Sequence, residues 1–477
     1  MGPEPKLKQS LRHYQIFFIA LSGVIGGGIF NNNAQALELS GPGGLILSIF
    51  AMGIIAICVG ECISELVQQF PAPNAIVEYV TAFVDKDFGW VVGIAYWYSM
   101  AAVFAIQSLA AAQLSMYWGM NQTWQTLTFY LLVPVALILL NILGVFTFGI
   151  VETIGGALKV CLVTGISIML YVFAAQEHLA SGPITDGFQN KIGYANDHHV
   201  ATCYAIPYVA LSFLGIEIVA VTGFEAKYTK DLRWPSRWIA PAVLILYLLC
   251  TMGEVLTTRW NDPLLPTIYN GTRSGNEKDL IRTHNIVINA ALKYGSHHLA
   301  GLLNGCLLFS VISSANTSLY VSSRTLVKIH KEALEQDHRY KHFSRGSEEY
   351  KAKTNFIWAQ PYIAWIGILG CTLVFAFTSA AWWDTPVLFS KVAVAYAAHI
   401  ILLAAFLLCK LINRRGWVKL DTDFSVLVEQ LRTLKWLKVD EEPGNDMELL
   451  RVIGKAGRGD SLPPSNGGSS TDVDALG

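Results

Sequence analysis

Long apolar runs separated by shorter polar connections dominate this sequence. A helix needs roughly 20 mostly apolar residues to cross the hydrocarbon core of a bilayer. About ten runs meet this requirement, and they cover residues 15–37, 44–67, 88–118, 126–146, 149–175, 201–225, 236–258, 287–325, 356–380 and 383–412. The pattern predicts an all-α polytopic membrane protein with about ten transmembrane helices.

A cluster of glycines interrupts the first run. Gly23, Gly26, Gly27 and Gly28 fall within six positions, and apolar residues continue on both sides. Glycine costs more backbone entropy in a helix than any other residue, so the helix is weakest at this cluster. We expect a spanning helix that is broken at mid-depth, whose second half offers N–H groups to an anion such as a carboxylate. Tight packing of an unbroken, glycine-rich helix is the alternative.

The sixth run is interrupted as well. Pro207 and Gly215 fall inside it, and Glu217 places a carboxylate near its middle. The two interrupted runs open two sets of five, residues 15–175 and 201–412, which is typical of a transporter with inverted repeats and a site near the bilayer midplane. We therefore expect a five-plus-five inverted-repeat core with helices 1 and 6 discontinuous. Glu217 either contacts substrate or protons, or braces the break by accepting main-chain N–H groups.

Lys159 is a second ionisable group expected deep in the membrane. It follows Glu152 by seven residues, so the two share one face of the fifth run about two turns apart. Removal from water disfavours the charged form of a lysine, which would make its protonation switchable. Snorkelling of the side chain to the lipid headgroups is the alternative.

Other polar residues in the runs are further candidates. Glu61, near the end of the second run, fits a gate or cap group. Ser313 and Asn316 belong to a polar stripe on the eighth run, which either lines a pathway or bonds neighbouring helices. His399 follows Lys391 by eight residues on one face of the tenth run, as a proton carrier or as a buried hydrogen-bonding group.

Composition and charge exclude several classes of protein. Only 14% of the 477 residues are charged and the net charge is -1, whereas soluble domains carry about 25% charged residues and nucleic-acid binders are basic. The eight cysteines lack the paired spacing of a metal site or a disulfide framework. The sequence has no nucleotide-binding loop or catalytic-triad signature, so we expect neither an enzyme nor a cofactor.

Basic residues assign an orientation to the runs. They concentrate before the first run and after the sixth, eighth and tenth runs. By the positive-inside rule, both termini are cytoplasmic. We expect a cytoplasmic N-terminus at residues 1–14, a transmembrane domain at 15–417 and a polar cytoplasmic tail at 418–477 that is partly disordered.

Five segments resemble the motifs of one family, in the family's order. They are LRHYQIFFIALSGVIGGGIF, GPGGLILSIFAMGIIAICVGE, GWVVGIAYWY, LSFLGIEIVAVTGFEAK and VISSANTSLYVSSRTL. Together they resemble the fungal amino-acid permeases of the amino acid–polyamine–organocation superfamily, from Leu11 to about Trp417. The resemblance implies a LeuT-like transporter core in the plasma membrane.

The resemblance also implies a binding site built mainly from main chain. The substrate carboxylate would bind N–H groups of the first break, at Gly26, Gly27 and Gly28. The substrate amino group would bind carbonyls from both breaks, at Ser22, Gly23, Phe213 and Leu214. Phe213 and Ile216 would shape the side-chain pocket.

Lys159 matches the lysine that in relatives occupies the place of a sodium ion and links the broken first helix to the eighth. This implies coupling to protons, with Ser313 and Asn316 nearby. The chain departs from the family at Gly27, where threonine is usual, and at Asn31–Asn33, where small residues are usual. A polar tail also stands where the family has its last two helices.

Three functions remain open from the sequence. The first is a proton-coupled amino-acid importer that works by alternating access. The second is a non-transporting nutrient sensor or a truncated remnant of a permease. The third is a permease for a polyamine or choline, which would not need N–H groups for a carboxylate. The expected partners are an amino-acid substrate, the proton and the lipid bilayer.

Overall fold

The computed structural model describes residues 11–69, 72, 74–181, 187–189, 195, 197–262, 265, 285–294, 297–331, 354–359, 362–378 and 389–413. Every regular element within these residues is helical, apart from an isolated bridge between Leu11 and Ala226. The all-α prediction is therefore confirmed. The predicted polar tail and most of the N-terminal segment lie outside the described residues.

Each of the expected membrane-spanning runs overlaps with a helix of the structure. Seven helical stretches are long and apolar enough to cross a bilayer, and the first of them, His13–Gln69, contains both the first and the second expected run. Two shorter apolar helices, Tyr362–Ala376 and Ala397–Ile412, correspond to the ninth and tenth runs. The predicted number of about ten passes agrees with this set.

Within the described residues, the helices form two halves that follow one another along the chain. Those of the first half are α1 (His13–Val24), α2 (Gly28–Gln69), α3 (Ala75–Phe83), α4 (Lys86–Ser115), α5 (Gln122–Leu127), α6 (Val133–Ile142) and α7 (Val145–Ser181). Those of the second half are α8 (His198–Ala210), α9 (Ile218–Thr222), α10 (Arg233–Thr257), α11 (Ile286–Lys293), α12 (His297–Lys331), α13 (Tyr362–Ala376), α14 (Phe389–Ala395) and α15 (Ala397–Asn413).

A sharp kink at Gly41 replaces the loop expected between the first two runs. Gly41 has a φ of +75°, in the left-handed region that favours glycine, and Pro42 follows it. A Cβ atom at Gly41 would lie 2.9 Å from the main-chain nitrogen of Gln189, so this position has no room for a side chain. Residues 28–40 of α2, which we call the arm, therefore form a separate helical piece between α1 and the kink.

The eighth expected run, 287–325, is two helices rather than one. Its first part is the short helix α11, which is capped by the side chain of Asn285 and ends at Lys293. The spanning helix α12 begins at His297. The expectation of a single long span was wrong because the polar residues between the two helices interrupt an otherwise apolar pattern.

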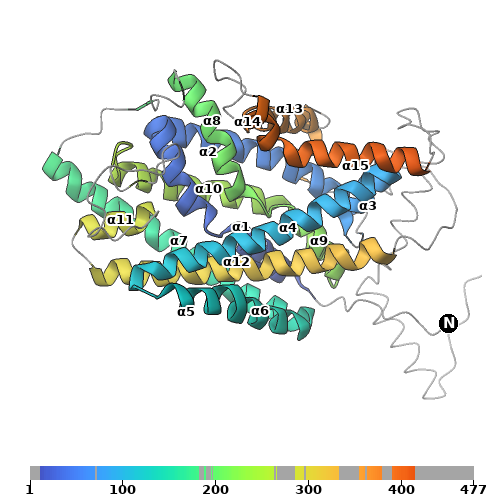
Figure 1. Cartoon of the computed structure of the whole chain (residues 1–477), viewed down its shortest axis with the longest axis horizontal. Helices are drawn as coiled ribbons and strands as arrows, with labels where there is room; N and C mark the ends of the chain where they lie inside the picture. The colour runs from blue at the N-terminus through green and yellow to red at the C-terminus, as the bar shows by residue number, and fades with distance from the viewer. Residues whose placement is uncertain are drawn as a thin grey trace, which may run out of the picture. The chain divides into compact units, whose positions relative to one another are not determined.

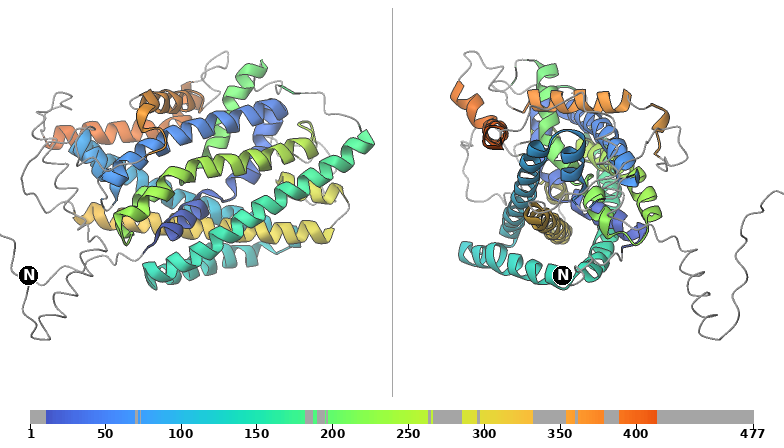
Figure 2. Two further views of the ribbon diagram at one scale, coloured as in Figure 1. Left: turned by 180° about the vertical axis from the view of Figure 1, so that it is seen from behind. Right: turned by 90° about the vertical axis from the view of Figure 1, so that its right-hand side faces the viewer.

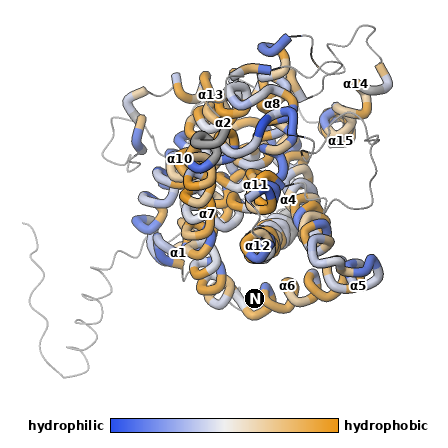
Figure 3. Tube along the Cα trace, turned by 90° about the vertical axis from the view of Figure 1, so that its left-hand side faces the viewer, coloured by the Kyte–Doolittle hydropathy of each residue, from blue (hydrophilic) through white to orange (hydrophobic). Residues whose placement is uncertain are grey.

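The broken first helix lies in the interior of the bundle. α1 packs against α7, α10 and α12, and α12 runs alongside α4 (Figure 1). The long helices share roughly one direction, as Figure 2 shows from two further sides. Most of the helical length is apolar, with hydrophilic residues gathered near helix ends and connections (Figure 3). The interior position of α1 brings its polar main chain into contact with three other helices.

The residue before α1 is tied to the segment after α9. The N–H of Leu11 donates to the carbonyl of Glu225 at 3.0 Å, and the N–H of Lys227 donates to the carbonyl of Leu11 at 2.8 Å. The buried carboxylate of Glu225 also forms an ion pair with Arg324 of α12 at 3.0 Å and accepts the hydroxyl of Tyr320. These contacts join α1, α9 and α12 at one end of the bundle.

Candidate functional site

The first helix stops at the glycine cluster. α1 ends at Val24, and Ile25 follows with a φ of -76° and a ψ of 90°, outside the helical region. Regular helix resumes at Gly28, the first residue of α2. The predicted break of the first span is therefore present, at residues 25–27.

The sixth span is broken as well. After α8 a short 3-10 turn ends at Phe213, and Leu214 is extended with a ψ of 131°. Gly215 has a φ of +114°, which only glycine adopts without strain. α9 begins three residues later, at Ile218. Both discontinuities that the sequence predicted are confirmed.

The two breaks approach each other through their main chains. A Cβ atom at Gly28 would lie 3.1 Å from the Cα of Ser212, and one at Gly215 would lie 3.2 Å from the nitrogen of Val24. Glycine at both positions permits this approach, because no side chain separates the two strands of backbone. The Ser212 hydroxyl is buried and has no hydrogen-bond partner among the described residues. Main-chain polar groups that no longer bond within a helix and an unpartnered hydroxyl together suit a small polar ligand.

The last carbonyls of α1 accept hydrogen bonds from neighbouring helices. Four carbonyls at the end of any α-helix lack a partner within the helix and need one elsewhere. Here side chains from α7, α10 and α12 supply the donors, namely Lys159 to Ser22 at 2.7 Å, Ser314 to Gly23 at 2.9 Å, Tyr247 to Val24 at 3.0 Å and Ser310 to Ile25 at 3.2 Å. The carbonyl oxygens of Ser22, Gly23 and Ile25 keep a second lone pair for a further donor, such as the amino group of a ligand, whereas the Val24 oxygen also accepts the N–H of Gly26.

The N–H groups at the first break are less occupied. The N–H of Gly26 donates to the carbonyl of Val24 at 2.9 Å. The N–H groups of Gly27 and Gly28 have no protein acceptor within the described residues. Gln107 of α4 lies beside them, since its Oε1 would be 3.4 Å from a Cβ atom at Gly27. A carboxylate therefore finds two available N–H groups here rather than the three that the sequence suggested.

Lys159 and Glu152 join α1, α7 and α12 in one buried network. The Lys159 ammonium donates to the carbonyl of Ser22 at 2.7 Å and lies 3.1 Å from its hydroxyl. That hydroxyl donates to Glu152 Oε2 at 2.5 Å, and Ser313 donates to the same oxygen at 3.1 Å. Asn316 donates to the other oxygen of Glu152 at 2.5 Å. Lys159 is 0% exposed, so its side chain does not snorkel to the surface.

The network brings together the residues that the sequence suggested for coupling, with two exceptions. Glu217 instead accepts the N–H of Gly215 at 2.9 Å and lies 3.5 Å from the hydroxyl of Tyr96. This is the geometry of a group that braces the second break. Glu61 is buried near the far end of α2, where the N–H of Phe356 approaches it at 3.4 Å.

The suggested pocket residues lie along the second break. Phe213 is buried and meets the ring of Tyr247 edge-on, with centroids 5.3 Å apart. Ile216 is also buried, and Leu214 is half-buried between them in the chain. Because Tyr247 also bonds the carbonyl of Val24, its ring connects the two breaks.

Sequence reasoning missed several residues that line the breaks. Tyr247 and Gln107 are polar groups inside long apolar runs, and that position is the signal that could have identified them. Ser212 belongs to the motif LSFLGIEIVAVTGFEAK, in which Phe213, Leu214 and Ile216 were assigned to the site but Ser212 was not. Ser310 and Ser314 belong to the polar stripe that the sequence indicates on the eighth run, but the sequence did not assign them to the first break.

Comparison with known proteins decides the family. The model of the amino acid permease family matches residues 15–352, which is more than half of the chain. The chain belongs to the amino acid permease family. This agrees with the resemblance seen in the sequence and with two broken helices in the interior.

Individual relatives of this permease are distant. It is 26% identical to the general amino-acid permease GAP2 of Candida albicans over 337 residues, 69% of this chain and 54% of that protein. It is 26% identical to the lysine-specific permease LysP of Escherichia coli, over 68% of this chain and 64% of LysP. It is 24% identical to a putative histidine permease of Bacillus subtilis, over 72% of this chain and 69% of that protein. The matched region thus spans roughly half to two thirds of these relatives.

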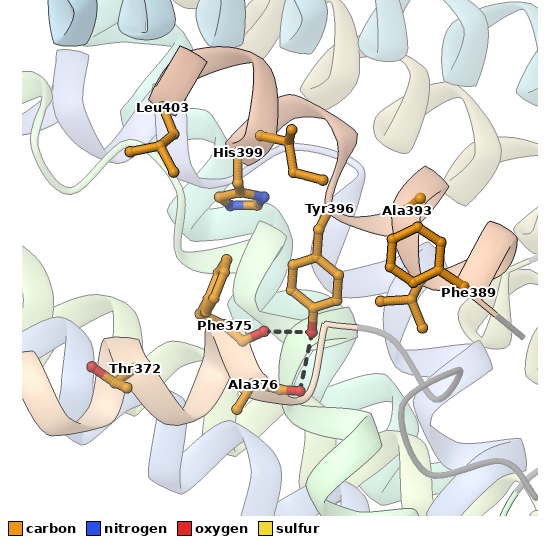
Figure 4. Close-up of a pocket in the computed structure, with 10 residues that line it drawn as sticks. Thr372, Phe375, Ala376, Phe389, Ala393, Tyr396, His399 and Leu403 are labelled. Carbon is orange, nitrogen blue, oxygen red and sulfur yellow. Dashed lines mark hydrogen bonds between the residues drawn. The ribbon is translucent and has the colours of Figure 1, made fainter. Parts of the chain in front are cut away.

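The permease also has an apolar pocket between α13, α14 and α15 (Figure 4). Its volume is about 740 Å³. His399 lines it and meets the ring of Phe375 edge-on, with centroids 4.7 Å apart. The hydroxyl of Tyr396 donates to the carbonyls of Phe375 and Ala376 at 2.9 and 3.1 Å. None of the pocket's lining residues belongs to either break, so His399 is not part of the site built there.

Proposed function

We propose that this permease imports an amino acid by alternating access and that protons drive the import. Membership of the amino acid permease family supports the substrate class. The relatives named above are permeases for general amino acids, for lysine and for histidine, which supports the same class without selecting one side chain. The plasma membrane is the proposed location, with both termini in the cytoplasm.

The substrate would bind as a zwitterion between the two breaks. Its carboxylate is proposed to accept the N–H groups of Gly27 and Gly28, with the free hydroxyl of Ser212 close by. An N-terminal helix end carries a partial positive charge, which adds to the attraction for a carboxylate. The amino group is proposed to donate to second lone pairs of carbonyls at the end of α1 and at Phe213 and Leu214. Phe213 and Ile216 are proposed to contact the substrate side chain.

The observation that carries the coupling proposal is the bond from Lys159 to the carbonyl of Ser22. A charged donor contributes about 1.5–3 kcal/mol to such a bond and a neutral donor about 1 kcal/mol. Loss of the lysine proton would therefore loosen the last turn of α1. Since Ser22 also touches Glu152 and Ser313, the same event would weaken the contact between α1 and α12. Movement of α1 would then open the site to the cytoplasm.

The test is uptake of labelled amino acids by liposomes that contain the purified chain. An inward proton gradient should raise accumulation above the level reached without a gradient, and Lys159→Met should remove that difference. A full set of unlabelled amino acids, used as competitors, identifies the side chain. Competition by amines without a carboxylate would instead favour a polyamine or choline carrier.

A sensor without transport would give a different result. Amino acids would then raise the thermal stability of the chain, yet no flux would occur under any gradient. Uptake that is indifferent to the gradient would overturn proton coupling while leaving amino-acid transport intact.

A further inference from the structure

The run Asn31–Asn33 fastens the arm to three other elements. Asn31 accepts from the side chain of Asn285, the cap of α11, at 3.2 Å. Asn32 donates to the carbonyl of Tyr208 in α8 at 3.0 Å. Asn33 donates to α10, to Thr251 Oγ1 at 3.0 Å and to Glu254 Oε2 at 2.7 Å. The three asparagines thus act as a clamp on the arm.

The arm can move as a unit because both of its ends lack regular helix. The first break precedes Gly28, and the kink at Gly41 follows the last residue of the arm. Changes of φ and ψ at two such points can swing a rigid piece without unfolding it. Asn33 lies near the middle of the arm, about 7–8 Å along the helix from Gly28. The clamp is therefore placed to hold or release the arm beside the proposed substrate site.

Glu254 is the unusual member of this clamp. Its side chain is 0% exposed, as are those of Asn33 and Thr251. Glu254 Oε1 and Asn33 Oδ1 have no hydrogen-bond partner within the described residues, although both are acceptors and both are buried. Two buried acceptor atoms of the cluster thus lack a donor, and a proton on Glu254 would turn one of its oxygens into a donor.

No cation balances this carboxylate within the described part of the chain. Titratable groups on the helices packed against α10 include Glu38 of the arm, Tyr171 of α7 and Lys293 of α11, with Cys250 on α10 itself. A buried, unpaired charge costs several kcal/mol, whereas a charged acceptor strengthens the bond from Asn33 by only about 1–2 kcal/mol. Because the cost of burying the charge is larger than this gain, neutral Glu254 stabilises the closed clamp more than charged Glu254 does.

We propose that Glu254 is a proton-binding site that closes the arm, separate from Lys159. Closure buries the carboxylate and takes up a proton, and opening admits water and releases the proton to the side from which it came. This proton therefore sets the pH dependence of closure but is not carried across the membrane. The proposal rests on the proposed transport function for its purpose, but proton binding and arm closure can be measured without transport.

The first test is infrared spectroscopy of the full chain in lipid nanodiscs, without any amino acid. Acidification from about pH 8 to about pH 5.5 should produce a carboxylic-acid C=O band. The band should be absent in Glu254→Gln and should remain, at a shifted position, in the matched control Glu254→Asp. A band of unchanged size in Glu254→Gln would overturn the proposal.

The second test is hydrogen exchange of residues 28–40, corrected for the intrinsic effect of pH. In the unmodified chain, exchange should be about tenfold slower at the acidic pH, since closure and protonation are linked. Glu254→Gln should be slow at both pH values, and Asn33→Ala, which keeps the acid but loses the clamp, should be fast at both. If hydrogen exchange of the arm keeps its full pH dependence in Glu254→Gln, Glu254 is not the proton-binding site that closes the arm. Failure of amino-acid uptake would leave both tests unaffected and would count only against the proposed function.

Discussion

The ammonium nitrogen of Lys159 lies 2.7 Å from the main-chain oxygen of Ser22, so a side chain of α7 holds the last turn of a helix that stops inside the bundle. The Ser22 hydroxyl continues the connection to Glu152 and, through it, to Ser313 and Asn316 of α12. A change at the amino group of Lys159 can therefore affect the contacts of three helices, α1, α7 and α12.

Lys159→Met should lower stability and abolish the response to a proton gradient. Removing the lysine leaves Glu152 as a buried charge without a cation, which costs about 3–5 kcal/mol. The double variant Lys159→Met/Glu152→Gln should recover most of the stability but none of the gradient response. Thermal unfolding in detergent and uptake into liposomes measure the two effects separately. Gradient-driven uptake by the double variant would show that Lys159 does not couple.

Alanine at Gly28 should harm binding more than alanine at Gly27. A methyl group at Gly28 meets the Cα of Ser212 at 3.1 Å, which is main chain and cannot turn aside. A methyl group at Gly27 meets the side chains of Val311 at 3.2 Å and Gln107 at 3.4 Å, both of which can rotate. Overpacking of a few tenths of an ångström against backbone costs about 1–3 kcal/mol, which would correspond to about five- to 150-fold in affinity. Equilibrium binding of a labelled amino acid to both variants checks this, and equal affinities would contradict the proposed site.

Glu217→Gln and Glu217→Ala should separate bracing from proton transfer. Glutamine keeps an oxygen that can accept the N–H of Gly215, so gradient-driven uptake should stay within about threefold of normal if Glu217 only braces the break. Alanine leaves that buried N–H unsatisfied and should reduce uptake and stability together. A glutamine variant that binds the amino acid normally but ignores the gradient would instead make Glu217 a proton carrier.

Asp85→Asn should weaken a pH-dependent link between α4 and α15, which Asp87 shares because it lies 3.3 Å from Lys410. Lys410 of α15 lies 2.6 Å from Asp85, the residue that caps α4. Partial burial alone would raise the pKa of Asp85, but the hydrogen bonds from Lys410 and from the N–H groups of Phe88 and Asp87 outweigh it and lower the pKa below 3.8. The link therefore contributes stability above about pH 4 that is lost as the pH falls through the lowered pKa.

Asparagine suits this test because it still accepts the capping N–H groups and loses only the charge. At neutral pH the variant should be less stable by about 1.5–3 kcal/mol. Unfolding midpoints of the two proteins should converge below about pH 4. A constant difference at every pH would mean that the charge of Asp85 contributes nothing.

The two breaks could be predicted because their causes are local. The glycines around Gly26 weaken a helix wherever they stand, and Gly215 marks the second break in the same way, whereas Pro207 lies within the regular helix α8. The network at Lys159 was accessible only through resemblance, since the partners of a buried lysine are set by the packing of other helices. The same resemblance assigned three N–H groups to a carboxylate. It did not indicate the turn in which the N–H of Gly26 donates to the carbonyl of Val24.

The clamp on the arm illustrates what the sequence could not provide. Three consecutive asparagines in a spanning run were visible as a departure from the family, but their partners were not. Asn33 and Glu254 are 221 residues apart, and the pairing depends on how α2 packs against α10. Glu254 itself lies near the end of an apolar run, where a carboxylate is ordinarily taken as a solvated end group.

The central claim is that the main chain of two broken helices binds a zwitterion. Equilibrium binding of one transported amino acid, compared with the amine formed by removing its carboxylate, tests it most directly. The amino acid should bind at least about a hundredfold more tightly, since the N–H groups of Gly27 and Gly28 lose their charged acceptor in the amine, and Gly28→Ala should erase most of that difference. Equal affinities for the two compounds, or an unchanged preference in Gly28→Ala, would contradict the account.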